Sequence, residues 1–194
     1  MKLLRIRAYF LLILVFDCAG SGCAEYVVTV DRFVFTPIDR ELIPSQSATI
    51  EHVGNRSYLS GHLYLGRSVD NVIALASLEI SRPNLPRVRL FNSKFDVCSF
   101  LKNTYKSKFL QQFHYRFVTF TNVQPSCPLK PHLNYTLERS YIDERILPEL
   151  LPECSYFFNV EFREKTKPLA NLHISGQLHP VLNKKRGPKN RVKI

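Results

Sequence analysis

The sequence predicts a β-sandwich interrupted by one amphipathic helix. Short runs rich in valine, isoleucine, phenylalanine and tyrosine recur along most of the chain, and glycine, proline or asparagine separates one run from the next. Such runs are typical of antiparallel strands joined by tight turns. About eight or nine of them with a single helical segment favour two packed sheets over a helical bundle or an α/β fold.

The domain is predicted to occupy residues 25–182, between a signal peptide and a basic tail. In residues 1–24, three basic residues precede an apolar run at 8–16, and small residues follow up to Ala24. That run is too short to span a bilayer, and no later run approaches the length of a transmembrane helix. We therefore expect a secreted, soluble, extracellular protein with one domain large enough for a real core.

The predicted strands are separated by turn signals. Gly54-Asn55 and Gly66-Arg67-Ser68 mark turns, and Pro83 and Pro86 interrupt the chain before the next alternating run. Within 155–164 the alternation is clear, with aromatic or aliphatic residues on one side and polar residues on the other, as in a half-buried strand. The strands are expected at 27–35, 48–51, 58–65, 71–80, 88–90, 115–121, 134–141, 155–164 and 172–178.

One amphipathic helix is expected over residues 96–113. Five apolar residues recur at every fourth position, a spacing that places them along one stripe of a helix. They are Val97, Leu101, Tyr105, Phe109 and Phe113. Such a stripe usually packs against a core, but it also suits a helix that forms one wall of a cavity for an apolar ligand. Periodicity does not separate these two interpretations.

The cysteines predict one disulfide, Cys98–Cys127. Such a bond closes a loop of about 30 residues, for which chain entropy gives roughly 3 to 4 kcal/mol. The pairing of the remaining cysteines depends on where the signal peptide is cleaved. Cleavage after Ala24, which the small residues favour, leaves Cys154 without a partner, whereas cleavage after Gly20 retains Cys23, which could pair with it. A cysteine nucleophile is not expected, because exported proteins oxidise paired thiols and no feature indicates a sheltered, reactive one.

Two sequons predict glycosylation at one or both of Asn55 and Asn134. Each begins an N-x-S/T triplet beside an expected turn or strand start. Behind a signal peptide, such sites carry surface glycans that increase solubility.

Positive charge is concentrated in the tail. Of the net charge of +11, residues 184–194 contribute +6 and the signal peptide +2, which leaves +3 for the folded domain. A nucleic-acid-binding protein needs a basic face on the domain itself, so this class of function is not expected. The tail is either a solvated, disordered end or a tether to anionic glycans or lipid headgroups.

No catalytic motif appears in the sequence. The six histidines lack metal-ligand spacing, and there is no glycine-rich phosphate loop or nucleophile elbow. Asp143 and Glu144 fall in a charged turn, where we expect them to be solvated. We therefore predict a protein that is not an enzyme and needs neither a metal nor a cofactor.

A known family shares several of these features. The order F-D-x-C-x-F-L from Phe95, a following asparagine, and Asn122 five residues before Cys127-Pro128 resemble small secreted insect proteins catalogued as a domain of unknown function (number 1091). The similarity extends over residues 55–71 and 147–162. That family includes the CheB-like chemosensory proteins of flies. It is related to the ML superfamily, whose name refers to myeloid-differentiation-related lipid recognition.

This resemblance implies an immunoglobulin-like, ML-like sandwich that holds a hydrophobic or amphipathic small molecule, such as a lipid or pheromone, between its sheets. It also implies a role in chemosensation. The candidate cavity wall comprises the helix stripe and the aromatic face of the strand at 155–164: Val97, Leu101, Tyr105, Phe109, Phe113, Phe158 and Phe162. The alternative is an extracellular module with a packed core that acts through its surface on a membrane receptor or a glycan, aided by the basic tail.

Overall fold

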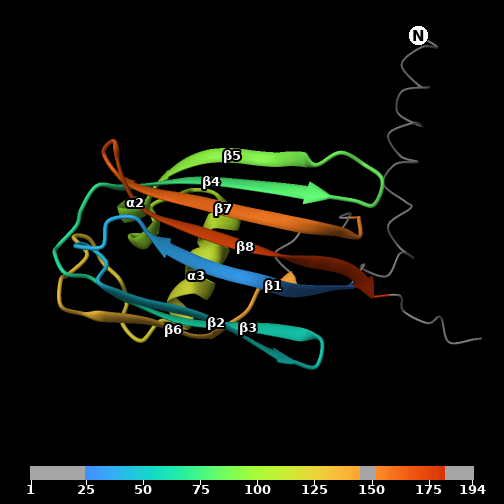
Figure 1. The fold of residues 1–194 in the computed structure, drawn as a ribbon, viewed down its shortest axis with the longest axis horizontal. Coiled ribbons are helices and arrows are strands. Elements are labelled where there is room, and N and C mark those ends of the chain that lie inside the picture. Colours follow the sequence, from blue (N-terminus) through green and yellow to red (C-terminus); the bar gives the residue numbers. More distant parts are fainter. Residues whose placement is uncertain (1–24, 145–151, 182–194) are drawn as a thin grey trace, which may run out of the picture.

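Two antiparallel sheets face each other in this protein (Figure 1). The structure, a computed structural model, describes residues 25–144 and 152–181. The predicted signal peptide, Cys23 and the basic tail lie outside these ranges. The larger sheet has the order β1 (Glu25–Pro37), β8 (Lys167–Val181), β7 (Cys154–Glu164), β4 (Val72–Ser81), β5 (Val88–Asp96). The smaller has the order β2 (Ser45–Val53), β3 (Arg56–Tyr64), β6 (Asn134–Ser140). The predicted β-sandwich is therefore confirmed.

The sandwich has two distinct ends, which lie at the left and right of Figure 1. At the core end β1 finishes at Pro37 and β7 at Glu164. At the tip end β4 finishes at Ser81 and β8 at Val181. The largest cluster of buried aliphatic side chains among the described residues lies near the core end, where connections from both sheets meet. This core-end cluster consists of Leu42, Ile43, Leu65, Val69, Val72, Leu169 and Ala170.

An irregularity in β1 keeps its apolar residues on one face. The register against β8 shifts between Val30 and Arg32, so Val30 and Phe33 both face inward although three positions separate them. Val30 lies opposite Gly176, where an added Cβ would stand 1.9 Å from the Thr29 carbonyl oxygen. The close approach of β1 to β8 at this point therefore requires glycine.

The predicted helix is wrong as a single element, because the chain forms two helices here, α2 (Val97–Leu101) and α3 (Lys108–Thr119). Asp96 caps the first by accepting a hydrogen bond from the Ser99 backbone N–H. The helix then ends, since Asn103 adopts a left-handed conformation with φ of 53°. The four-residue spacing of apolar side chains continues through this break, so periodicity does not detect it.

The strand expected at 115–121 is also wrong, because α3 continues to Thr119. Side chains three and four positions apart on α3 pack together against α2. Phe113 and Phe117 both contact the ring of Phe100, at centroid distances of 5.7 and 6.0 Å. Between them, the buried His114 places Nε2 3.1 Å from the Leu101 carbonyl oxygen. Helical packing on α2 thus prevails over the local alternation of apolar and polar residues.

The predicted disulfide is confirmed. Cys98 of α2 is bonded to Cys127, in the connection that leads from α3 to β6, with the Cα atoms 5.5 Å apart. The bond fixes that connection to α2, and α2 itself lies against β4 and β5. Cys154, in contrast, is a free thiol buried beside Tyr26, Val28 and Leu178.

Removal of this crosslink is expected to destabilise the fold. Cys98→Ser and Cys127→Ser should each lower the free energy of unfolding by about 2 to 5 kcal/mol and sharply reduce secretion, because the unfolded chain regains conformational freedom. The double variant should be no worse than either single one. Urea unfolding and secreted yield from a eukaryotic host provide the measurement. Cys154→Ala is the control: it removes a thiol but no crosslink, and an equal loss in that variant would contradict the prediction.

Candidate functional site

The inner face of the larger sheet carries a group of large apolar side chains that are only partly buried. Its centre is formed by the small or medium side chains of Ala74, Ala76 and Val160, which are buried. Around them lie larger side chains from β5, β7 and β8, none of which is fully buried. We call this group the inner aromatic face: Phe91, Phe95, Phe158, Phe162 and Leu172 around Ala74, Ala76 and Val160.

Strand register positions these residues. Ala74 lies between Phe95 on β5 and Phe162 on β7, and Ala76 lies beside Val160. Because side chains alternate across a strand, Phe158 and Phe162 point to the same side. Phe162 packs against the core-end cluster, which the smaller sheet also joins through Leu63 and Tyr135. The face is therefore turned toward the smaller sheet.

The smaller sheet comes nearest to the larger one at β1, which β2 and β3 both approach. Near the middle of α3, His114 contacts the last residue of α2. The end of α3 is tied to β6, because the Glu138 N–H donates to the Phe120 carbonyl. In the view of Figure 1, α3 runs behind β8 and β1.

The aromatic rings are held in place by one another. Phe91 and Phe158 meet edge to face with centroids 6.3 Å apart, and Phe35 lies at the same distance from Phe162. Edge-to-face pairs favour fixed ring positions. Since Ala74 and Ala76 occupy the centre of the face, the side chains there are small and project little toward the smaller sheet. The arrangement offers an apolar surface with aromatic sides and few hydrogen-bonding groups.

The structure brings together only part of the predicted cavity wall. Val97, Phe158 and Phe162 lie in one cluster on the inner face. Leu101 is buried near α3, with its carbonyl oxygen contacting His114. Tyr105 folds back onto β5, where its hydroxyl oxygen accepts from the Asp96 N–H at 2.8 Å.

Two residues of the predicted stripe remain outside this cluster. Phe113 is 43% exposed beside Phe100. The side chain of Phe109 lies outside the described part of the structure.

Sequence reasoning missed Phe91 and Phe95. The apolar residues Val88 and Leu90 alternate with arginines in the sequence and therefore suggest that even-numbered positions of this strand face inward. In the structure Leu78 pairs with Phe91 and Glu79 with Arg89, so Leu90 is an extra residue that shifts the inward face to odd positions. The sequence did contain a signal for inward-facing odd positions, namely the phenylalanines at 91 and 95 that alternate with polar residues.

Two surface pockets flank the sandwich, and neither lies between the sheets. One of about 280 Å³ lies under the connection from β1 to β2. The other, of about 450 Å³, opens at the tip end and is lined by residues of the β4–β5 connection, β7 and β8: Arg82, Pro83, Leu85, Glu153, Cys154, Ser155 and Gln177. Burial raises the pKa of the Cys154 thiol, which therefore stays protonated at neutral pH.

Hydrolytic or metal chemistry has no support in the described residues. They contain no group of three histidine, cysteine or acidic side chains that could hold a metal ion. His62 contacts the Ser47 hydroxyl at 2.7 Å, but its other ring nitrogen faces Ser45, so no carboxylate orients it as in a catalytic triad. No helix in these residues has the length and apolar character needed to cross a bilayer.

The expectation that Asp143 and Glu144 are solvated is wrong. Asp143 is 4% exposed and paired with Arg116 of α3. Glu144 pairs with Arg56 of β3 at 2.8 Å. These two ion pairs hold the segment after β6 against α3 and the smaller sheet, which explains why charged residues are found inside the fold.

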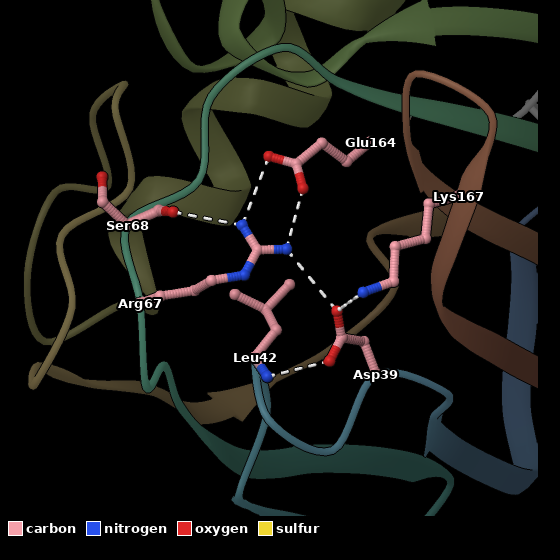
Figure 2. Close-up of polar contacts among 6 residues, drawn as sticks. All are labelled: Asp39, Leu42, Arg67, Ser68, Glu164 and Lys167. Carbon is pink, nitrogen blue, oxygen red and sulfur yellow. Dashed lines mark hydrogen bonds and ion pairs between the residues drawn. The ribbon is translucent and has the colours of Figure 1, made fainter.

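A second charged group clamps the core end (Figure 2). The Asp39 carboxylate accepts from the Leu42 N–H at 3.1 Å and from Lys167 Nζ at 2.7 Å. Arg67 donates to both Glu164 oxygens and reaches Asp39 at 3.5 Å. The group thereby joins three connections: β1 to β2, β3 to β4, and β7 to β8.

This ion cluster shifts the titration of its members. Lys167 and the Leu42 N–H lower the pKa of Asp39, and Arg67 lowers the pKa of Glu164. Glu164 in turn raises the pKa of Arg67. The shifts of Asp39, Glu164 and Arg67 thus all favour the charged forms. We interpret the cluster as a structural clamp, because its acids and bases are engaged with one another and no acceptor or donor is directed to a substrate.

These features define a β-sandwich with a partly exposed apolar inner face. Residues 75–158 of the chain match the family described as "Protein of unknown function (DUF1091)". The match runs from β4 into β7 and includes both helices, the disulfide, Phe91, Phe95 and Phe158. It confirms the resemblance to this family that the sequence motifs indicated.

Other comparisons are weaker. No curated protein sequence matches the chain. Among solved structures, chicken MD-1 complexed with lipid IVa is similar with a TM-score of 0.36 and 9% identity, over 82% of this chain and 99% of that one. A TM-score this low establishes no shared function, so the proposals below are argued from the residues of this chain.

The ion cluster predicts a loss of stability in acid. Asp39 and Glu164 have lowered pKa values in the folded state. Their contribution to the free energy of unfolding is therefore complete above the pKa values of the unfolded chain, about 3.9 and 4.3. That contribution is lost as the pH falls through the lower pKa values of the folded state. Asp39→Asn should reduce the free energy of unfolding at pH 7 by about 1.5 to 3 kcal/mol and flatten its decline below pH ~4. Urea unfolding across pH measures both.

The control for this experiment is Glu51→Gln. Glu51 pairs with Arg139, and both side chains are 56% exposed, so this surface pair should contribute about 0 to 1 kcal/mol. If both variants show the same pH dependence of stability, the clamp interpretation is wrong.

Proposed function

We propose that this protein is a secreted, non-enzymatic binding protein for a hydrophobic or amphipathic small molecule, which lies against the inner aromatic face. The observation that carries the proposal is the partial exposure of five large apolar side chains on the side of the sheet that should be a packed interior. Burying one such side chain completely is favourable by about 1.5 to 3 kcal/mol. Leaving several partly exposed is a cost that an apolar ligand would remove.

The chemistry of the face indicates the class of ligand. Phenylalanine, leucine, valine and alanine supply dispersion contacts and exclude water but donate no hydrogen bonds. The ligand segment in contact with them is therefore an acyl chain, a terpene-like chain or a similar hydrocarbon. Polar groups of an amphipathic ligand would be placed at the edge of the face, where the edge strand β5 meets solvent.

The finer proposal is a role in chemosensation, with a lipid or pheromone-like ligand and a membrane receptor as partner. It rests on the resemblance to the CheB-like proteins. The confirmed disulfide supports an oxidising, extracellular environment for the folded protein.

The alternative function is a surface-acting extracellular module with a packed interior. It is favoured by one observation, namely that neither pocket lies between the sheets. The two functions differ in ligand content. Native mass spectrometry of protein secreted by eukaryotic cells should show a co-purified lipid-like adduct if our proposal holds. A mass that corresponds only to protein and glycan, together with no binding of a lipophilic dye, would favour the module.

Binding should depend on Phe158 and not on its neighbour Phe157. Phe158 faces inward beside Phe91, whereas Phe157 lies on the outer face, with the Arg87 guanidinium 3.8 Å from its ring. Phe158→Ala should weaken binding of a fluorescent fatty-acid analogue about tenfold, as expected for losing one aromatic contact of about 1.4 kcal/mol. Phe157→Ala should leave binding unchanged. Fluorescence titration measures both affinities.

The titration also needs a control for folding. Phe158→Leu retains apolar volume and should bind more tightly than Phe158→Ala, and thermal unfolding shows whether each variant is folded. Equal affinity of the folded Phe158→Ala variant and the unaltered protein would place the ligand elsewhere.

Glycosylation is proposed at Asn55 and Asn134. Both are exposed, the first in the turn between β2 and β3 and the second at the start of β6. We expect enzymatic removal of N-glycans to lower the mass of the secreted protein, and Asn55→Gln and Asn134→Gln to abolish separate parts of that shift. A secreted protein of unmodified mass would contradict the proposal.

A further inference from the structure

The connection between β4 and β5 is exposed along its whole length and combines apolar with basic side chains. We call residues 82–90 the tip hairpin. Leu85 and Val88 are each 49% exposed and Leu90 is 46% exposed. These three lie within six consecutive positions at one end of the molecule (Figure 1). Large apolar side chains that cluster in this way on a soluble surface indicate an interaction site.

The charge of the tip hairpin is positive. It contains Arg82, Arg87 and Arg89, and residues 82–90 include no acidic residue. Glu79 pairs with Arg89 at 2.8 Å and with Arg87 at 3.6 Å, so one carboxylate partly compensates two guanidinium groups. The hairpin therefore keeps an excess of positive charge around its apolar side chains.

Two further features converge on the same end. The 450 Å³ pocket is lined by Arg82 and Leu85 of the tip hairpin together with Cys154 and Gln177. In addition, β8 ends at this end of the sandwich, at Val181. The sequence that follows carries six positive charges in residues 184–194.

We propose that the tip hairpin docks the protein on an anionic lipid bilayer, with Leu85, Val88 and Leu90 inserted among the headgroups. Arginine is suited to this role because its planar guanidinium binds phosphate through two hydrogen bonds. Apolar side chains beside it gain by entering the boundary between headgroups and acyl chains. A sulfated glycan would satisfy the arginines but would offer nothing to three exposed aliphatic side chains.

This inference rests on the proposed function and extends it, because it identifies a membrane as the place where an amphipathic ligand is taken up or released. Phe91 of the inner aromatic face directly follows Leu90 in β5, so docking brings one edge of that face close to the bilayer. The path of a ligand through water is then short, which limits the cost of exposing its apolar surface during transfer.

Vesicle binding of the full secreted protein tests this. Co-sedimentation is measured with vesicles of phosphatidylcholine alone and with vesicles that contain about one third phosphatidylserine. We expect binding to the anionic vesicles, with affinity that falls as salt increases. The double variant Leu85→Asp, Leu90→Asp should bind about tenfold more weakly or not at all. Arg82→Gln combined with Arg87→Gln should weaken binding and reduce its dependence on salt.

Matched controls lie away from the tip hairpin. Ile38→Asp alters a side chain that is 45% exposed at the core end, and Arg139→Gln removes an exposed arginine from β6. Neither change should affect vesicle binding. Deletion of residues 183–194 should weaken binding but preserve the effect of the leucine variants.

Several outcomes would overturn the proposal. These are no binding to either vesicle, an equal loss in Ile38→Asp, or binding that depends on the arginines and the tail but not on the leucines. The last result would assign the surface to an anionic glycan or protein. Fluorescent fatty-acid binding without vesicles is measured on the same variants. If it persists while vesicle binding is absent, docking has failed and the proposed function stands; if it is absent in the unaltered protein, the proposed function has failed.

Discussion

Connections from both sheets pack together at the core end, and much of the structure depends on this constraint. There the core-end cluster buries Leu42 to 1% exposure and Ala170 to the same extent. The Asp39 ion cluster lies over it and ties three connections that are far apart in sequence. Buried aliphatic packing supplies the stabilisation, and the charged side chains fix which connections meet. A further link lies nearer the tip end, where the Val30 N–H of β1 donates to the Ser57 hydroxyl of β3 at 2.9 Å.

The inner aromatic face lies on β4, β5, β7 and β8, whereas β2 and β3 come nearest to the larger sheet at β1. The helix α2 lies against β4 and β5, and the Cys98–Cys127 bond holds the chain around it in place. A closely packed sandwich would place large side chains from the second sheet over Ala74 and Ala76. Here those alanines are surrounded by partly exposed phenylalanines, and the proposed ligand site rests on this arrangement.

Much of the fold could be predicted from local pattern. Alternation identified the long strands, because one buried face and one exposed face impose a period of two on the residues. Prediction from alternation and helical spacing failed where the backbone of a helix or strand was interrupted. The left-handed Asn103 ended a helix whose apolar spacing continued. The extra residue Leu90 reversed which side of β5 is buried, so Phe91 and Phe95 were missed. Asp143 was expected in solvent because its partner Arg116 is 27 positions away and on another element.

The sequence by itself therefore determined the strand content, the turns, the cysteine crosslink and the concentration of positive charge in the tail. These properties depend on residue type and short-range spacing. Tertiary structure alone decided which connections meet at the core end and that Phe91 and Phe158 pack edge to face. Those arrangements depend on register shifts and on which distant segments are neighbours. A single residue inserted into a strand changes them while leaving the local pattern almost unaltered.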